Sequence, residues 1–526
     1  VHGDIYLEFS SSTGTYDTSF TNGEADRTSV AGAYATAVNG DITMVFNDGV
    51  FSHRIFGGLY TGNKTISGST SLYINGGTFM NEIYAGNKTD GTISQGTSLT
   101  VTGTDAILGK ADGDNWTWTL LCGGNKASGT INGGTAITLK DIAATTGDGS
   151  EHKFDKYAGT IDGKGGGTVN GEKKLVFDHY TTSFLGTLQN FDKVQVTGNS
   201  DLALDKALGN TVASLTVDAG SALRFNQDQG ATLDITNNGT IRTSHNLTLK
   251  SADTGTGTYW VEGGTLDLAG QAVSGKISIS AGALANTAGL GAGSVSVSGI
   301  TGNVNLGGLD GSKLNSINMG SGTGTISGLT GHADLSGSDT QLRLSAANMG
   351  ADGTGIIQFN DAANSTLTLG NLTLTLTADA VALLAAPGDY AFHVTNAALH
   401  ADTNHITLSE YNGMAWDITR TEGGQVIISF GQLDAMVIDK GASKNVTSAS
   451  TLGATPSVTN NGTLNIDLSA ATAPEDKTTT IRYLAGTEAG AVVNTGTDSD
   501  VIITLLNETS ADPDKPGNTA YAGSIE

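Results

Sequence analysis

Short runs in which apolar and small polar residues alternate recur along the chain. Residues 3–9 (GDIYLEF) and 40–46 (GDITMVF) each place an apolar side chain at every second position after Gly-Asp. A period of two predicts β-strands, because successive side chains of a strand point to opposite faces. Between the strands of these units there is no 3.6-residue helical period. The pattern therefore predicts an all-β fold.

The strand-like runs form repeats that can be aligned. Residues 72–79 match 44–51, and residues 97–101 match 135–139, at spacings from about two dozen to under forty residues. Repeats of this size are typical of solenoids, propellers or arrays. A propeller blade needs four antiparallel strands, whereas these units offer two or three short strands and Gly-rich turns. We predict a right-handed parallel β-helix with irregular loops, in which rungs about 4.8 Å apart form a rod on the order of 100 Å long.

Changes in the repeat pattern divide the chain into segments. Residues 372–376 predict a strand, 378–386 a short helix and Gly423-Gly424 a hairpin turn, so this part is either a small antiparallel β section or a wider part of the coil. The predicted segments are a β-helix with 24–38-residue repeats (1–140), an irregular acidic Gly-rich excursion (141–173), a β-helix with shorter rungs of about twenty residues (174–370), an atypical β segment (371–435) and a β-helix continuation (436–526).

Composition supports this fold and excludes several functions. Gly accounts for 75 of 526 residues and Pro for 5, which excludes collagen because collagen needs Gly at every third position and abundant Pro. The net charge of -25 comes without a Lys/Arg cluster, so we predict no binding to nucleic acid. No apolar run approaches the ~18 residues that span a bilayer, and we predict no direct membrane insertion of this chain. The single cysteine, Cys122, is predicted to be a small buried apolar side chain.

Several segments resemble bacterial surface proteins. Residues 74–79 and 83–88 resemble repeats of large surface proteins from gut-dwelling bacteria, and residues 188–204 and 237–246 look like passenger domains of autotransporters (type V secretion). Residues 518–526 resemble the start of a passenger-associated transport repeat. The resemblance implies a cell-surface or extracellular β-helix, truncated before a further repeat and tethered to the outer membrane through a missing C-terminal region.

The resemblance also limits the functions to be considered. Such passengers include adhesins, self-associating proteins, proteases and esterases. We predict an adhesin or structural stalk that presents loops to host glycans, to mucin-like or matrix ligands, or to sister cells; self-association is a further expectation. The alternatives are a glycan-binding or glycan-cleaving β-helix and an esterase or protease passenger. Catalysis is left open but disfavoured, because residues 147–150 and 291–295 meet hydrolase motifs only in part.

Two tryptophans are the best candidates for ligand contact. Trp116 and Trp118 are two positions apart, so on a strand they share one face. With Asp112, Asp114 and Asn115 beside them, the two indoles could stack sugar rings. The alternative is an aromatic cluster that covers an edge of the core.

No cofactor is predicted, with one alternative. The oxygens of residues 112–115 could gather round Ca²⁺, although the EF-hand pattern is not met. His179 follows Asp178, but adjacent strand residues face opposite sides, so we expect no metal site there. Trp260 and Trp416 are isolated in sequence and are expected to cover hydrophobic edges.

Overall fold

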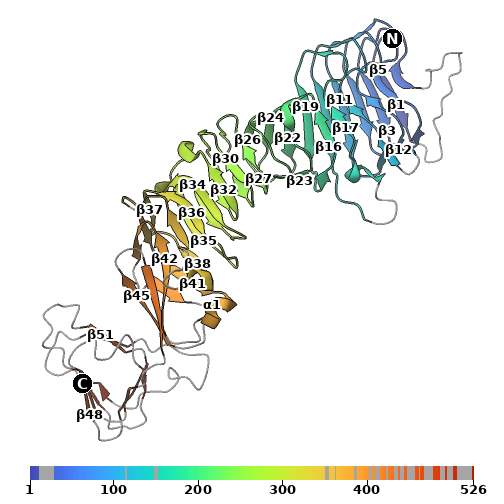
Figure 1. The fold of residues 1–526 in the computed structure, drawn as a ribbon. Helices are drawn as coiled ribbons and strands as arrows, with labels where there is room; N and C mark the ends of the chain where they lie inside the picture. The colour runs from blue at the N-terminus through green and yellow to red at the C-terminus, as the bar shows by residue number, and fades with distance from the viewer. Residues whose placement is uncertain are drawn as a thin grey trace. The chain divides into compact units, whose positions relative to one another are not determined.

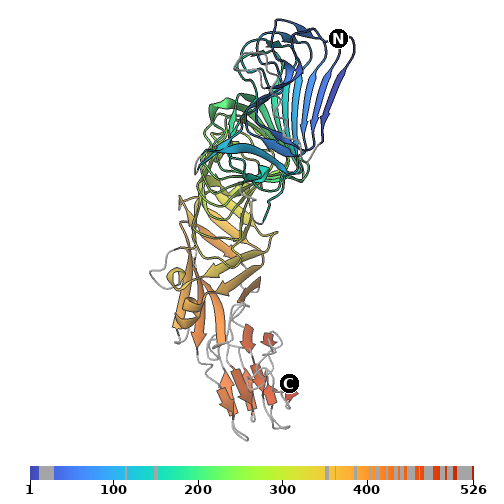
Figure 2. The same cartoon turned by 90° about the vertical axis from the view of Figure 1, so that its right-hand side faces the viewer.

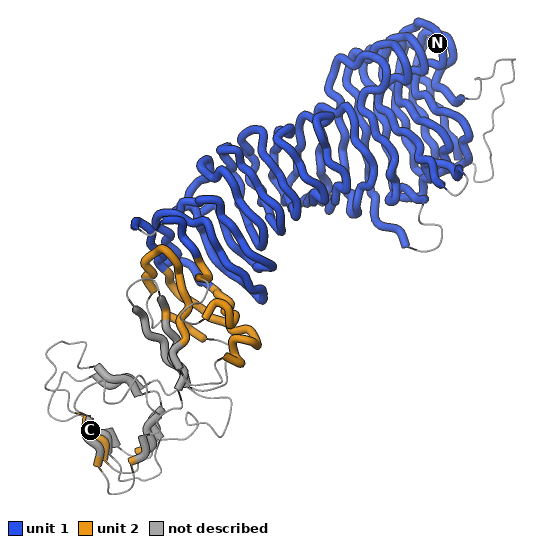
Figure 3. The backbone as a smooth tube through the Cα atoms, in the orientation of Figure 1, with its two compact units in different colours: residues 1–340, 358–368 blue, residues 341–357, 369–526 orange. Residues whose placement is uncertain are grey.

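The structure is a computed structural model. It describes residues 1–10, 29–112, 115–146, 152–349, 355–361, 363–383, 388–401 and 405–408. Beyond residue 408 it describes the backbone of the strands between residues 415 and 525. Backbone contacts divide the chain into two units, drawn in two colours in Figure 3. Unit 1 contains residues 1–340 and 358–368, and unit 2 contains residues 341–357 and 369–526.

Unit 1 is a stack of parallel strands wound into a β-helix (Figures 1 and 2). Most consecutive strands of a rung belong to different sheets, and equivalent strands of successive rungs pair in parallel. The predicted fold class is therefore confirmed. One sheet contains β1 (Ile5–Phe9), β3 (Ile42–Phe46), β7 (Thr70–Ile74), β11 (Thr97–Thr102), β16 (Thr135–Lys140), β19 (Lys173–Asp178), β22 (Phe191–Thr197), β24 (Val212–Val217) and β26 (Asp234–Asn237).

Three further sheets complete the first rungs. The second contains β2 (Val30–Ala33), β5 (Ile55–Leu59), β9 (Ile83–Tyr84), β14 (Leu121–Cys122), β17 (Thr160–Asp162) and β21 (Thr187–Gln189). The third contains β4 (Val50–Phe51), β8 (Gly77–Phe79), β12 (Ala106–Asp112) and β13 (Asn115–Trp118). The fourth contains β6 (Thr65–Ile66), β10 (Thr92–Ile93), β15 (Thr130–Ile131) and β18 (Thr168–Val169).

The later rungs of unit 1 build two more stacks. The first contains β20 (Ser183–Phe184), β23 (Asp201–Leu204), β25 (Ala222–Phe225), β27 (Thr240–Thr243), β29 (Thr258–Val261), β31 (Lys276–Ile279), β33 (Val295–Ser298) and β35 (Leu314–Asn318). The second contains β28 (Leu247–Thr248), β30 (Thr265–Asp267), β32 (Gly282–Ala285), β34 (Val304–Asp310) and β36 (Ile326–Thr330). Other elements are β37 (His332–Leu335), β39 (Ile357–Phe359), β40 (Thr366–Leu369) and the 3-10 helices η2 (Phe154–Lys156), η3 (Gly209–Thr211), η4 (Thr287–Gly289) and η5 (Gly311–Lys313).

The strand register confirms the alignments made from the sequence. Met44 pairs with Leu72, and Thr97 pairs with Thr135. The positions that the repeats aligned therefore lie side by side on neighbouring strands of one sheet.

The interval between register partners shortens along unit 1. In the first rungs the interval is long and unequal, as the steps from Ile5 to Ile42 and on to Thr70 show. From Ala222 to Val297 it is shorter and constant, as from Thr240 to Thr258 and from Thr258 to Lys276. Outward side chains that follow this constant interval therefore lie one above another.

The core of the coil is a set of stacked apolar columns. In β11, buried and partly exposed residues alternate, and Leu99 and Val101 are fully buried. Leu72 precedes Leu99 in its column and Ile137 follows it. Burying a side chain of this size contributes roughly 1.5–3 kcal/mol. The alternation that predicted strands is thus the pattern that fills the core.

Polar side chains inside the coil form hydrogen bonds between its strands. Thr70, Thr97 and Thr135 share one register position and are buried. Their hydroxyls donate to the carbonyl oxygens of Ala85, Gly123 and Gly163 at 2.5, 2.5 and 2.6 Å. The buried Asn125 accepts a hydrogen bond from the backbone N–H of Asn87 at 2.7 Å. Each such bond offsets the cost of burying the polar group.

The segment 141–173, predicted as an irregular excursion, contains further strands of the coil. β17 pairs with β14 and β21, and β18 pairs with β15. Residues 141–146 and η2 lie outside these strands. Strands of two or three residues among glycines show too little alternation to be recognised from the sequence.

The cysteine lies in the core as predicted. Cys122 in β14 is fully buried beside Phe56, Tyr60 and Tyr84. Burial raises the pKa of its thiol well above the usual range. The side chain therefore acts as a small apolar group.

Unit 2 combines parallel strands with an antiparallel section. β46 pairs antiparallel with β42 and with β45, which confirms the predicted antiparallel β section near 371–435. The turn predicted at Gly423-Gly424 lies outside the described residues. The elements are β38 (Thr340–Leu344), η6 (Ala346–Asn348), β41 (Leu372–Leu376), α1 (Ala378–Leu383), β42 (Gly388–Thr395), β43 (Ala398–Ala401), β44 (Ile406–Leu408), β45 (Ala415–Thr421) and β46 (Gln425–Gly431).

The last strands of unit 2 pair in parallel. They are β47 (Met436–Ile438), β48 (Ser443–Val446), β49 (Ser457–Asn460), β50 (Thr463–Ile466), β51 (Thr478–Ile481), β52 (Tyr483–Ala485), β53 (Val492–Asn494), β54 (Ile502–Leu505) and β55 (Ser524–Ile525). Among the described residues, no helix is long and apolar enough to cross a membrane.

The columnar core generates a first prediction. Leu99→Ala removes a fully buried side chain between two other core residues and should lower the free energy of unfolding by about 2–5 kcal/mol. Thr100→Ala, at the neighbouring outward position, should change it by no more than about 0.5 kcal/mol. Urea unfolding followed by circular dichroism measures both. Equal effects of the two substitutions would contradict the assigned strand face.

Candidate functional site

The two tryptophans predicted to bind a ligand lie on a hairpin. β12 and β13 pair antiparallel, with Gly109 opposite Trp118 and Asp112 opposite Asn115. β12 also pairs in parallel with β8, so one side of the hairpin belongs to the coil. Trp116 and Trp118 lie on the same face of β13, as their spacing predicted, and their ring centroids are 5.9 Å apart.

Other aromatic side chains pack against both indoles. The imidazole of His152 stacks on Trp116 with 3.8 Å between centroids. Trp118 meets the edge of Tyr157 at 5.5 Å. Tyr157 is buried, its hydroxyl donates to the carbonyl oxygen of Thr119, and burial raises the pKa of that hydroxyl. These contacts favour the interpretation of the cluster as a cover over an edge of the core.

The polar residues of the predicted site lie at the end of the hairpin. Asp112 and Asn115 are exposed. Asp114 lies outside the described residues, as do residues 147–150 of the partial hydrolase motif. In the part of the chain that the structure describes, no three His, Cys, Asp or Glu side chains gather in a way that could hold a metal ion.

The geometry around His179 differs from our expectation. His179 follows the end of β19 and has a left-handed backbone, with φ of 52°. This turn brings its Nδ1 atom to 2.8 Å from the Asp178 carboxylate and 3.8 Å from that of Asp141. The expectation that His179 and Asp178 face opposite sides is wrong, because alternation holds only within a strand.

Trp260 is a surface residue rather than a cover for a hydrophobic edge. It is an outward residue of β29, and 36% of its surface is exposed. Its register neighbours are Arg242 on β27 and Ser278 on β31. The expectation for Trp260 was wrong because the sequence alone did not fix which face of its strand points inward. The predicted role of Trp416 concerns a side chain outside the described residues.

Arg224, Arg242, Trp260 and Ser278 form one outward column, which we call the Arg-Trp column. They are register partners on β25, β27, β29 and β31 and follow one another at a constant interval in the sequence. Successive members therefore lie about 4.8 Å apart. The guanidinium carbon of Arg242 lies 4.9 Å from the centroid of the Trp260 ring, a cation–π contact.

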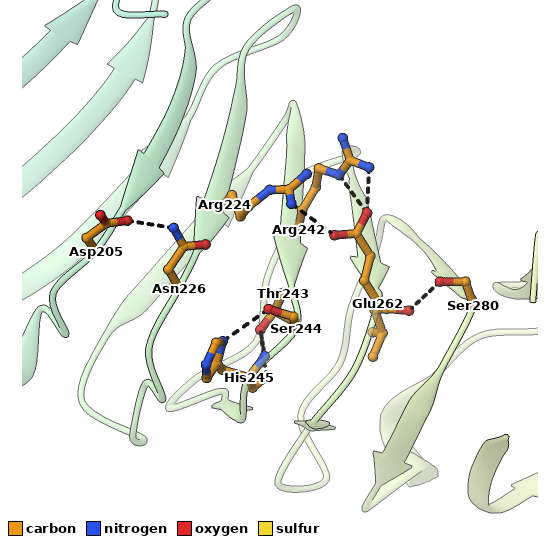
Figure 4. A network of polar contacts seen from close by, with 10 residues as sticks. Asp205, Arg224, Asn226, Arg242, Thr243, Ser244, His245, Glu262 and Ser280 are labelled. Carbon is orange, nitrogen blue, oxygen red and sulfur yellow. Dashed lines mark hydrogen bonds and ion pairs between the residues drawn. The ribbon is translucent and has the colours of Figure 1, made fainter. Parts of the chain in front are cut away.

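Glu262 holds the two arginines in place (Figure 4). Its Oε1 atom accepts hydrogen bonds from Nε and Nη2 of Arg242 at 3.1 and 2.5 Å. Its Oε2 atom lies 3.7 Å from Nη1 of Arg224. Two guanidinium groups thus share one carboxylate, which leaves one net positive charge in the group. The paired contacts also fix the guanidinium against the indole.

The opposite side of Trp260 faces small side chains. Beyond Trp260 the column continues with Ser278, Ser296 and Ser316, all partly exposed. Lys276 is exposed on β31, two residues before Ser278 and on the same face of the strand. Side chains of this size leave room beside the indole. We call the surface over Ser278 beside Trp260, with Lys276 on the same face of β31, the ledge.

Comparisons with known proteins assign no family. No family model matches the chain, and no match was found among curated proteins or solved structures. The candidate site therefore depends on the geometry of the described residues alone.

Sequence reasoning missed the Arg-Trp column although the sequence contains a signal for it. Arg224, Arg242, Trp260 and Ser278 follow one another at a single, repeated interval. The rung length estimated from the sequence, about twenty residues, is not precise enough to align these four residues with one another. Only an exact period reveals which outward side chains meet.

The hairpin generates a second prediction. A Cβ atom at Gly109 would lie 2.3 Å from Nε1 of Trp116 and 2.6 Å from the carbonyl oxygen of Thr117. Gly109→Ala should therefore displace the Trp116 indole, shift the tryptophan fluorescence and lower the free energy of unfolding by about 1–3 kcal/mol. Gly230→Ala is the matched control, because no atom lies within 4 Å of its added Cβ. Unchanged fluorescence in Gly109→Ala would contradict the packing of Trp116 on this glycine.

Proposed function

We propose that this chain is a β-helical adhesin scaffold displayed outside the cell, and that it binds saccharides through the side of its coil. The Arg-Trp column is the contact surface. The fold supports the proposal, since a parallel β-helix is the architecture that the resemblance to autotransporter passengers implies.

The observation that carries the proposal is the fixed, half-uncovered indole of Trp260. Arg242 covers one ring face, and Glu262 restrains the Arg242 guanidinium. The other ring face looks over Ser278. An aromatic ring already held in place loses little conformational entropy when a ligand stacks on it.

The chemistry around this indole matches that of a sugar. A pyranose ring has a face of C–H groups, which packs on an aromatic surface, and a rim of hydroxyl groups that need hydrogen-bond partners. The hydroxyl of Ser278, the register partner of Trp260, is such a partner. A flat apolar ligand would leave the Ser278 hydroxyl without a partner.

The proposed contact surface is the side of the coil and not the hairpin. At the hairpin, His152 covers a face of Trp116 and the buried Tyr157 packs against Trp118. On the coil, the only described side chain stacked on the Trp260 ring is Arg242. This contrast favours Trp260 as the stacking surface.

The proposal generates a third prediction. Wild-type protein should bind members of an array of host oligosaccharides that includes mucin-type glycans, and Trp260→Ala should weaken that binding at least about tenfold. Titration calorimetry with the best array member measures the loss. Circular dichroism should show an unchanged fold, because the Trp260 side chain points outward.

Tyr73→Ala is the matched control for this experiment. Tyr73 is an exposed aromatic residue on β7, a strand of a different sheet, and 40% of its surface is exposed. Its removal should leave saccharide binding unchanged. If no array member binds the wild-type protein, or if Trp260→Ala and Tyr73→Ala bind equally well, the proposed function is wrong.

A further inference from the structure

We infer that the ligand of the ledge beside Trp260 is a sugar with a carboxylate group, and that Lys276 binds this carboxylate. The inference depends on the proposed function, because it names the chemical class of saccharide that the same surface accepts. Uronic acids and sialic acids share this chemistry.

The position of Lys276 supplies the first argument. Lys276 is the first residue of β31 and the register partner of Thr258, whereas Ser278 is the partner of Trp260. Two residues along a strand span about 6.8 Å. A lysine side chain can cross this distance, so its ammonium can reach the edge of a ring stacked on the free face of Trp260.

The absence of an ion-pair partner for Lys276 among the described residues supplies the second argument. Its side chain is exposed, and it forms no ion pair with any residue that the structure describes. By contrast, Arg242 and Arg224 already share Glu262. The ammonium of Lys276 can therefore form an ion pair with a carboxylate of the ligand.

The charge of the whole chain narrows the ligand class further. With a net charge of -25, the protein surface disfavours long polyanions, such as sulfated polysaccharides, which contact many residues at once. At physiological ionic strength the field of these charges is screened beyond about 8 Å. A single carboxylate beside Lys276 and the Arg224–Arg242–Glu262 group therefore experiences the local positive charge. The arrangement fits a ligand with isolated carboxylates.

The test compares acidic sugars with neutral counterparts. The probes are trigalacturonate with its methyl ester, and sialyllactose with lactose, titrated into the full chain by calorimetry. Wild-type protein should bind at least one acidic probe about three- to fivefold more tightly than its neutral counterpart, the upper part of the range expected for one exposed ion pair. The two acidic probes distinguish uronic from sialic acid as the source of the carboxylate.

Substitution of the lysine completes the test. Lys276→Gln should reduce the affinity for the acidic probe to that for the neutral one and leave neutral binding unchanged. Lys193→Gln, which removes the same charge from β22 in another sheet, should preserve the preference. Trp260→Ala should weaken acidic and neutral binding alike.

The outcomes separate the two proposals. Equal binding of acidic and neutral probes by the wild-type protein, or a preference that persists in Lys276→Gln, overturns the inference and leaves the proposed function standing. Absence of binding by all four probes and by the whole oligosaccharide array overturns both.

Discussion

Backbone hydrogen bonds between one rung and the next determine the position of every side chain in this β-helix. The N–H of Ile42 donates to the carbonyl of Ser69 at 2.9 Å, and that of Thr258 donates to the carbonyl of Gly239 at 2.8 Å. Such bonds fix the register, because a slip by one residue would turn every inward side chain outward. The register in turn places apolar side chains of successive rungs on top of one another, as with Leu72, Leu99 and Ile137 in one core column.

The same constraint acts on the outer surface, where no packing requirement selects the residues. Outward side chains of successive rungs must lie about 4.8 Å apart, whatever their chemistry. Arg242 is therefore placed against the Trp260 ring, and Ser278 leaves the opposite face of that ring uncovered. Glu262, just beyond the end of β29, can reach both Arg224 and Arg242. The proposed binding surface thus requires no irregular loop.

The sequence predicted the parts of this structure that depend on inward residues. Alternation around Met44 and Leu72 gave the correct strand faces and the correct register, because burial selects apolar side chains at those positions. The hairpin of β12 and β13 and the column at Trp260 were not predicted, because outward residues carry no periodic signal in their hydrophobicity. The segment around β17 was missed because its strands are too short to alternate.

The proposed binding surface depends on the small side chain of Ser278 beside Trp260 in its column. Ser278→Tyr tests it most directly, because this substitution removes no side chain of the proposed site other than one serine hydroxyl and fills the space next to the indole. Saccharide affinity of this variant, measured by calorimetry beside Ser316→Tyr two rungs further along, is the decisive quantity. This dependence predicts that Ser278→Tyr lowers affinity at least about tenfold and that Ser316→Tyr does not. Wild-type affinity in a folded Ser278→Tyr protein would contradict it.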